Sequence, residues 1–178
     1  MSLKIAVALA VIVAGLALVV AMQPSSFAIE RSTAIGAPAA VVYDHVESLR
    51  VMDAWSPWPK MDPQMKITYE GPEVGVGARS SWEGPKIGKG RLRITAVRPD
   101  REVELELEML APMKATNRVL FTLAPADAAT QVTWRMEGSN GFVGKALSLL
   151  MNSDRMVGAE FEKGLASLKA LAEDDAGR

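Results

Sequence analysis

The chain contains no cysteine and only one histidine, His45, among its 178 residues. The absence of cysteine excludes disulfide bonds, thiolate metal sites, iron–sulfur clusters and cysteine nucleophiles. A catalytic triad would have to use His45, but no nucleophile-elbow motif accompanies it, and no H-x-x-H cluster indicates zinc. We therefore predict a surface or half-buried histidine, no metal site and no cofactor.

Neither sign of charge is in excess, since 20 lysines and arginines stand against 21 aspartates and glutamates. Proteins that bind nucleic acid usually carry a strongly basic face. The basic residues of this chain are instead scattered among acidic ones. The composition argues against a nucleic-acid partner, and it gives no indication of a protein partner.

Charged and strongly polar side chains are absent from residues 5–22, IAVALAVIVAGLALVVAM. As an α-helix this run would be roughly 27 Å long, close to the ~30 Å hydrocarbon core of a bilayer. It is longer than the apolar stretch of about 7–15 residues in a signal peptide, which favours an uncleaved transmembrane anchor over a cleaved signal. The predicted anchor includes Ile5, Leu9, Leu16 and Val20.

Lys4 and the amino terminus supply positive charge before this run. The positive-inside rule then places the amino terminus in the cytoplasm. We predict a single-pass membrane protein whose domain lies on the side away from the cytoplasm, with a cytoplasmic-facing domain as the alternative. The predicted organisation is an anchor and linker at residues 1–26, one domain at 27–173 and a flexible tail at 174–178.

Within the domain, glycine or proline interrupts the sequence about every 10–15 residues, which is typical of a meander of antiparallel strands. Apolar and polar residues alternate between these breaks; for example, Val103, Leu105, Leu107 and Met109 alternate with glutamates. One face of the sheet should therefore be apolar and the other solvated. The predicted strands are 27–37, 65–70, 77–83, 89–97, 102–110, 115–123 and 130–137.

Helical patterns flank the six later strands. Pro38 suits a first helical turn, and apolar residues between 41 and 49 recur at helical spacing, so one or two short helices should end near residue 53. Residues 142–173 carry an apolar stripe that predicts one long helix, able to cross a whole sheet. The fold class is α+β, with the helix covering the apolar face of the sheet.

Two charged residues break these patterns. Arg31 shares the parity of apolar residues in the first strand, which indicates a bulge or an edge position. Asp154 lies on the apolar stripe of the long helix, where a carboxylate should be paired, protonated or in a wet cavity. Arg135 and Lys145 are conceivable partners, and the alternative is a helix phase that puts Asp154 on the surface.

Residues 54–64, AWSPWPKMDPQ, hold two tryptophans and three prolines, and we predict that they lack regular structure. Trp55 and Trp58 could form the wall or gate of a binding site, or they could cap the core while the prolines stiffen the crossing. Asp62 should start a turn. The glycine-rich residues 83–91 lack the GK[ST] ending of a phosphate loop and precede a strand, which predicts a hairpin turn.

Several segments after the apolar run carry a family resemblance. They are Glu30-Arg31-Ser32, Ile35-Gly36-Ala37-Pro38, Trp55-Ser56-Pro57-Trp58, Asp62-Pro63, Gly75-Val76-Gly77-Ala78, residues 130–136, residues 154–158 and residues 161–165. With these segments the chain resembles the SRPBCC or START-like superfamily, and more specifically bacterial polyketide cyclase/dehydrase-like proteins. The resemblance implies that the predicted membrane is the bacterial inner membrane and that its outer side is the periplasm. The resemblance implies a helix-grip fold, in which a curved seven-stranded antiparallel sheet wraps around a long carboxy-terminal helix. It also implies a cavity between them for lipids, sterols or polyketide intermediates.

We predict a ligand cavity lined by Trp55, Trp58, Trp82, Met109, Trp134, Met136, Asp154 and Phe161. The alternative for the tryptophans and methionines is that they fill a dry core.

Three functions compete at this point. The first is a membrane-tethered module that binds or transports a lipid or other hydrophobic small molecule. The second is a cyclase-like or dehydratase-like enzyme, with Asp154 as its acid or base and Arg135 or Tyr69 as remoter candidates. The third is a non-catalytic interaction domain of the cell envelope with a filled core. The first is favoured, because no dense set of polar residues points to catalysis.

Overall fold

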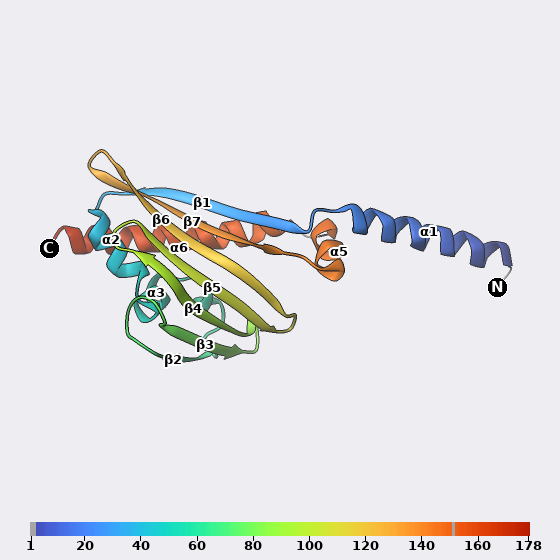
Figure 1. The fold of residues 1–178 in the computed structure, drawn as a ribbon, viewed down its shortest axis with the longest axis horizontal. Coiled ribbons are helices and arrows are strands. Elements are labelled where there is room, and N and C mark those ends of the chain that lie inside the picture. The colour runs from blue at the N-terminus through green and yellow to red at the C-terminus, as the bar shows by residue number, and fades with distance from the viewer. Residues whose placement is uncertain (1–2, 151) are drawn as a thin grey trace.

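The fold is described from a computed structural model, which covers residues 3–150 and 152–178. Seven antiparallel strands form one sheet in the order β1-β7-β6-β5-β4-β3-β2 (Figure 1). Their bounds are β1 (Ser26–Ile35), β2 (Lys66–Glu70), β3 (Arg79–Gly84), β4 (Gly88–Arg98), β5 (Glu102–Ala111), β6 (Ala115–Ala126) and β7 (Ala129–Ser139). All seven predicted strands are confirmed, because the alternation that the sequence carries matches the two faces of this sheet.

Six helices accompany the sheet in the described residues. They are α1 (Leu3–Met22), α2 (Ala39–Val46), α3 (Leu49–Trp55), α4 (Trp58–Met61), α5 (Phe142–Leu150) and α6 (Ser153–Ala176). The short helices after the first strand are confirmed. The tryptophan segment is more regular than predicted, because α3 extends to Trp55 and a short helix starts at Trp58.

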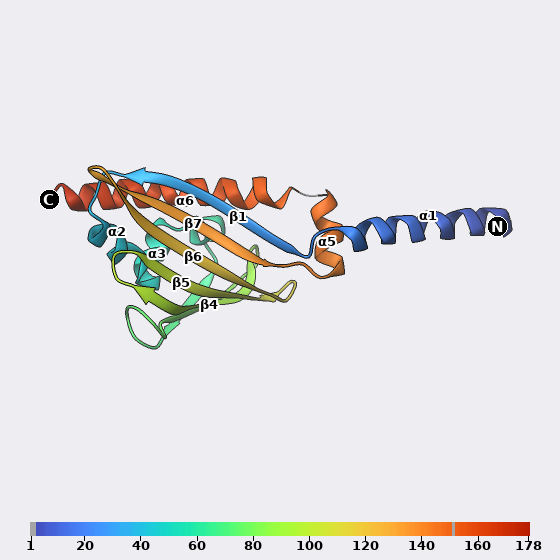
Figure 2. The ribbon, with the colours of Figure 1, turned by 45° about the horizontal axis from the view of Figure 1, so that its top comes forward.

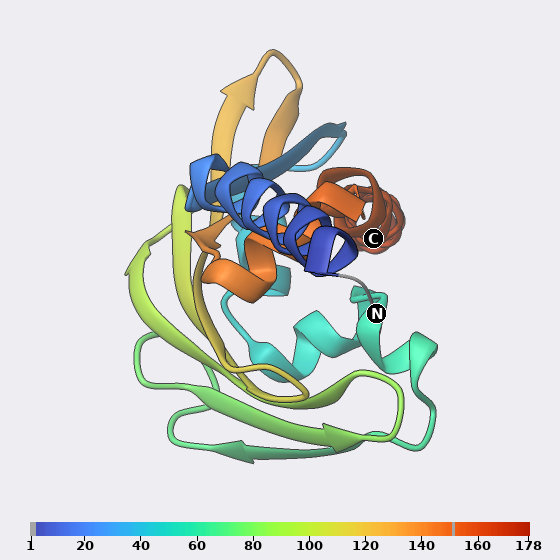
Figure 3. The same cartoon turned by 90° about the vertical axis from the view of Figure 1, so that its right-hand side faces the viewer.

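The sheet curves around α6, and α2 and α3 lie at its open side (Figure 3). Strand β1 is an edge strand that pairs with β7 over its whole length, from Ser26 opposite Ser139 to Ile35 opposite Thr130. The chain then crosses through α2, α3 and α4 to β2 at the opposite edge. This crossing brings the tryptophan segment between the two edges of the sheet, across its concave face.

The predicted long helix is two helices. The α5 helix ends at Leu150, and Asn152 caps the next helix by accepting a hydrogen bond from the Arg155 backbone N–H at 2.9 Å. An asparagine at this position satisfies one of the free N–H groups of a new helix, which favours a restart there. Helix α6 runs along the sheet, whereas α5 lies beside α1 (Figure 2).

The prediction of a transmembrane anchor, which included Ile5, Leu9, Leu16 and Val20, is wrong. The apolar run does form the helix α1. A single span needs a helix whose length and apolarity both match the hydrocarbon core. Across residues 3–150 and 152–178, no helix is long and apolar enough to cross a membrane. The predicted single-pass location in the bacterial inner membrane depended on that anchor and is corrected with it.

The core lies between the concave face of the sheet and the helices α2, α3 and α6. Apolar side chains of every one of these elements are buried there, including Val42, Leu49, Phe121 and Leu168. His45 is also buried, in contrast to the prediction of a surface or half-buried histidine; its Nε2 lies 3.0 Å from Asp175 near the end of α6. The pair ties α2 to the carboxy-terminal end of the helix.

Gly164 lets α6 approach the sheet closely. An alanine Cβ at this position would lie 2.7 Å from Trp134 Cζ3 and 3.2 Å from Pro57 Cδ. Helix propensity favours alanine over glycine by about 1 kcal/mol, but overpacking of a core costs about 1–3 kcal/mol. We expect the overpacking to outweigh the gain in helix propensity, so that Gly164→Ala lowers the free energy of unfolding by up to about 2 kcal/mol, measured by urea denaturation. The control Gly15→Ala has no neighbour within 4 Å of the new Cβ, and equal stability of both variants would contradict the steric argument.

Candidate functional site

A cavity of about 330 Å³ lies between the concave face of the sheet and the helices α3, α4 and α6. Its walls are mainly apolar and aromatic side chains from all three helices and from five strands. They are Met52, Asp53, Ser56, Trp58, Pro59, Met65, Ser80, Trp82, Ile87, Leu92, Leu105, Leu107, Met109, Asn117, Val119, Phe121, Trp134, Met136, Val157 and Phe161. The volume falls at the lower end of the range of about 300–1,000 Å³ for small-molecule sites.

An aromatic cluster forms one side of this cavity. The rings of Trp134 and Phe161 stack with centroids 4.0 Å apart, and Trp134 also lies 5.1 Å from Phe121. The ring of Trp55 packs edge-on against Trp134, with the two ring centroids 5.5 Å apart. The indole N–H of Trp55 donates a hydrogen bond to the His45 carbonyl oxygen at 2.9 Å. Trp55 is fully buried and does not line the cavity.

Trp82 forms the opposite side. It lies across from Gly90 in the β3–β4 pair, and a Cβ on Gly90 would be 2.3 Å from Trp82 Cζ2. The indole therefore packs directly against the bare backbone of Gly90. Gly90 belongs to the predicted 83–91 hairpin, and its lack of a side chain leaves room for the Trp82 ring in the cavity wall.

Three buried polar atoms on the lining residues have no hydrogen-bond partner in the part of the chain that the structure describes. They are the indole nitrogens of Trp82 and Trp134 and the side-chain oxygen of Asn117. Buried polar groups in native proteins are almost always hydrogen-bonded, and leaving one unpaired costs about 1–3 kcal/mol. These three atoms expose almost no surface to the cavity, so neighbouring groups enclose them although their side chains belong to its wall.

Asp53 is the one ionisable side chain among the described residues of the wall. It accepts a hydrogen bond of 2.5 Å from the Tyr69 hydroxyl, which joins α3 to the edge strand β2. Burial raises the pKa of the Asp53 carboxyl, and the bond from Tyr69 opposes that rise. Burial, followed by the bond to Asp53, raises the pKa of Tyr69 to about 12, so Tyr69 stays a donor at neutral pH.

Asp154 does not line the cavity. It lies on the exposed side of α6 and pairs with Arg31, whose Nη1 is 3.1 Å from Asp154 Oδ1. Arg31 Nε also lies 2.8 Å from Glu162 Oε1, and its guanidinium rests over Gly158. The hydrogen bonds that Arg31 donates to Asp154 and then to Glu162 raise the pKa of Arg31. Asp154 thus has a structural partner, which is neither Arg135 nor Lys145.

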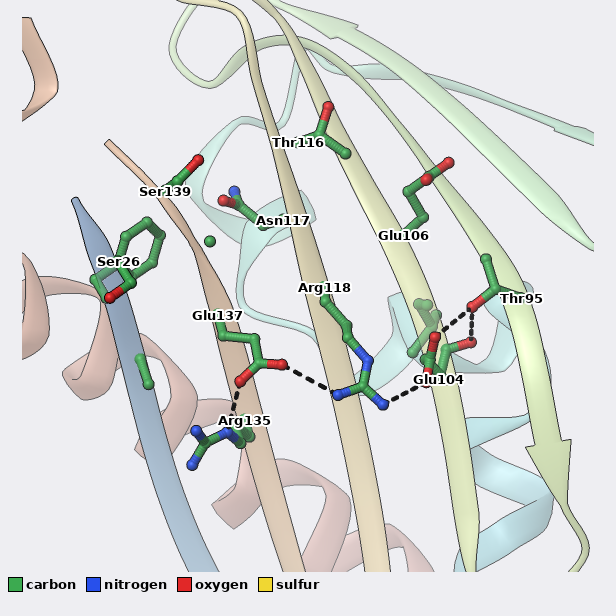
Figure 4. A pocket seen from close by; sticks show the side chains of 14 residues that line it. Ser26, Thr95, Glu104, Glu106, Thr116, Asn117, Arg118, Arg135, Glu137 and Ser139 are labelled. Carbon is green, nitrogen blue, oxygen red and sulfur yellow. Dashed lines mark hydrogen bonds and ion pairs between the residues drawn. The ribbon is translucent and has the colours of Figure 1, made fainter. Parts of the chain in front are cut away.

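A larger hollow of about 760 Å³ on the outer face of the sheet has a different character (Figure 4). Arg118 bridges Glu104 and Glu137, and Arg135 pairs with Glu137 and Glu30. The bonds from Arg118 hold the pKa values of Glu104 and Glu137 below the ordinary range. These side chains form ion pairs with one another at the solvent-exposed surface. The hollow therefore belongs to the solvated face of the sheet, which the alternation of apolar and polar residues predicted.

The eight predicted cavity residues fall into two groups. Six of them line the observed cavity: Trp58, Trp82, Met109, Trp134, Met136 and Phe161. The other two, Trp55 and Asp154, lie behind its wall and on the exposed side of α6. Whether the lining residues bind a ligand stays a prediction.

Sequence reasoning missed Asp53 and Asn117. A signal existed for Asn117, because it interrupts the apolar parity of Val119, Phe121 and Leu123 in the same strand. No comparable signal marked Asp53, which meets Tyr69 only because α3 packs beside β2.

Comparisons with known proteins bear on the fold and the family. A structure of a protein from Chromobacterium violaceum matches with a TM-score of 0.60 at 16% identity, over 82% of this chain and 96% of that one. A protein from Mesorhizobium loti matches with a TM-score of 0.62 at 13% identity, over 83% and 98%. The di-domain ARO/CYC protein StfQ from the steffimycin biosynthetic pathway matches with a TM-score of 0.61 at 13% identity, over 86% of this chain and 53% of that one.

At these identities the structural matches show the shared fold alone. No curated protein sequence matches this chain. The family evidence comes from a family model described as "Polyketide cyclase / dehydrase and lipid transport", which matches residues 26–173. This range runs from the first strand through most of α6, and so takes in the whole sheet and the cavity. The chain therefore belongs to the polyketide cyclase/dehydrase and lipid transport family.

Proposed function

We propose that this protein binds or carries a lipid or other hydrophobic small molecule in the cavity between its sheet and α6. The observation that carries the proposal is the cavity itself, about 330 Å³ with walls that are mainly apolar and aromatic. A dry core of the same composition would be packed as densely as an organic crystal. The family favours the same function, since its description includes lipid transport.

The first experiment asks whether the cavity takes a ligand. The purified protein would be titrated with N-phenylnaphthylamine, a neutral dye whose fluorescence rises in apolar surroundings, and organic extracts of the native protein would be analysed by mass spectrometry. We expect saturable dye binding and a co-purified hydrophobic compound. A flat titration together with empty extracts would contradict the proposal.

A blocking variant localises the binding. Leu107 lines the cavity, and the preceding residue of β5, Glu106, faces the outer side of the sheet. We expect Leu107→Trp to weaken dye binding by about tenfold or more, because the added ring occupies the cavity; tenfold is about 1.4 kcal/mol. Glu106→Trp places the same side chain on the other face of the same strand. Equal effects of the two variants, in proteins with the wild-type circular dichroism, would place the binding elsewhere.

A second candidate function, a cyclase-like or dehydratase-like enzyme, is favoured by one observation. Asp53 lies in the cavity wall with a pKa that burial raises, as suits a general acid or base. Asp154 cannot take this role from its place outside the cavity. A dehydratase would return its hydrophobic ligand lighter by one water, whereas a cyclase would return an isomer of the same mass with a changed chromatographic retention, and Asp53→Asn would abolish either change. A ligand recovered with both its mass and its retention unaltered supports binding alone.

A further inference from the structure

We propose that one end of the domain docks on the surface of an anionic lipid bilayer. This end, the basic end, consists of α4, α5 and the turns at residues 85–87 and 112–114. The antiparallel registers bring these parts together, because the β3–β4 and β5–β6 hairpins both turn where β1 begins and β7 ends. The contact is with the surface of the bilayer and requires no helix that spans it.

The basic end carries lysines that no acidic side chain neutralises. Four of them are exposed, and none of the four forms an ion pair with another described residue: Lys60, Lys66, Lys86 and Lys114. Nearby acidic side chains are already engaged. Glu83 pairs with Lys89, and the buried Asp62 accepts from two backbone N–H groups. The basic end therefore presents a positive surface to a partner.

The opposite end of the sheet carries the reverse charge. Its turns contain Glu73, Asp100 and Asp127. Helix α6 also ends there, with three successive acidic residues at 173–175. Because the whole chain has a net charge of only -1, the separation of the charges, and not an excess of one sign, directs the basic end toward an anionic surface.

Exposed apolar side chains lie among these lysines. Met61 on α4, Met113 in the 112–114 turn and Phe142 on α5 are all exposed. Further exposed apolar residues of α5 are Val143, Leu147 and Leu149. Apolar side chains beside lysines suit the interface of a bilayer, where the apolar groups enter the acyl boundary and the ammonium groups meet phosphate head groups.

The cavity opens at the same end of the domain, which faces the viewer in Figure 3. Its lining residues there keep partial exposure: Trp58, Met65, Ile87, Met109 and Val157. By contrast, Leu105 and Phe121 are fully buried deeper in the cavity. Docking through the basic end would hold the mouth of the cavity against the bilayer. The docking surface itself does not depend on the proposed ligand.

The test is co-sedimentation of the full chain with lipid vesicles. The probes are vesicles of phosphatidylcholine alone and vesicles of phosphatidylcholine mixed with phosphatidylglycerol. We expect about tenfold or more tighter binding to the anionic vesicles, and we expect high salt to remove most of this difference. Equal binding to both vesicles would assign the contact to apolar residues alone, such as those of α1, and would overturn the inference. Binding to neither, as expected if the basic end meets an acidic protein instead, would overturn it too.

A charge reversal at each end of β5 locates the contact. Lys114 follows β5 at the basic end, Arg101 precedes β5 at the opposite end, and both are exposed. We expect Lys114→Glu to weaken binding to anionic vesicles by about fivefold or more, and Arg101→Glu to change it by less than about twofold. Equal effects of the two variants would show that net charge acts in place of the basic end.

An apolar pair of variants tests insertion. Met113 in the 112–114 turn is 50% exposed, and Val76 in a loop at the opposite end is 56% exposed. We expect Met113→Ser to weaken vesicle binding by about threefold or more and Val76→Ser to leave it unchanged. Equal binding of both variants would refute insertion at the basic end. Dye titration of the same proteins reports on the cavity separately, so a failure of vesicle binding leaves the proposed function standing.

Discussion

Trp55→Ala should lower the free energy of unfolding by about 3–5 kcal/mol, the range for removing a buried aromatic side chain from a core. Trp55 is 0% exposed and packs edge-on against Phe121 and Trp134. Its removal leaves a void and deprives the His45 carbonyl of its indole donor. Such a loss is a large share of the roughly 5–15 kcal/mol that stabilises a typical domain. Urea denaturation followed by circular dichroism measures it.

Trp58→Ala is the matched control, since it removes the same side chain from the same segment. Trp58 is only partly buried and lies in the cavity wall. We expect it to cost clearly less stability than Trp55→Ala and to weaken dye binding by several-fold. If Trp58→Ala proved as destabilising as Trp55→Ala, the assignment of one indole to the core and the other to the cavity would be wrong.

Asp62→Ala should cost about 2–3 kcal/mol of unfolding free energy. Asp62 is 1% exposed, and its Oδ2 accepts from the backbone N–H groups of Lys86 at 2.8 Å and Ile87 at 3.2 Å. These bonds fasten the end of α4 to the β3–β4 hairpin. Hydrogen bonds to a charged group contribute about 1.5–3 kcal/mol, and alanine leaves two donors without their acceptor.

Asp62→Asn separates the hydrogen bonds from the charge, because its amide oxygen can occupy the place of Oδ2. We expect it to retain more than half of the stability that Asp62→Ala loses. Hydrogen exchange at the Lys86 and Ile87 amides should accelerate strongly in Asp62→Ala and less in Asp62→Asn. Unchanged exchange at both amides in Asp62→Ala would refute the attachment of α4 to the hairpin.

These two predictions assign separate tasks to one proline-rich segment. Trp55 completes the core, Trp58 lines the cavity and Asp62 fastens the hairpin beside the cavity. The sequence showed that the segment is unusual and predicted a turn at Asp62. It did not show the acceptor role of this carboxylate, because Lys86 and Ile87 lie more than twenty residues further along the chain.

The two charges that broke the sequence patterns explain each other. Arg31 occupies an edge strand, as its parity predicted, and it pairs with Asp154 on α6. When one positive and one negative residue each interrupt an otherwise apolar face, here on β1 and on α6, the pattern indicates an ion pair between the two elements. The sequence suggested Arg135 and Lys145 as partners of Asp154 and missed Arg31, since only the packing of α6 across β1 decides which cation Asp154 meets.

The sequence by itself determined the strands, the short helices and the solvated face of the sheet. Each of these follows from local periodicity and turn residues, which act over a few neighbouring positions. Tertiary structure decided the break before α6, the place of Trp55 behind the cavity wall and the pairing of Asp53 with Tyr69. It also decided that space remains between the sheet and the helix, because a cavity is the volume that side chains from distant parts of the chain leave unfilled. No periodicity in one segment encodes that volume.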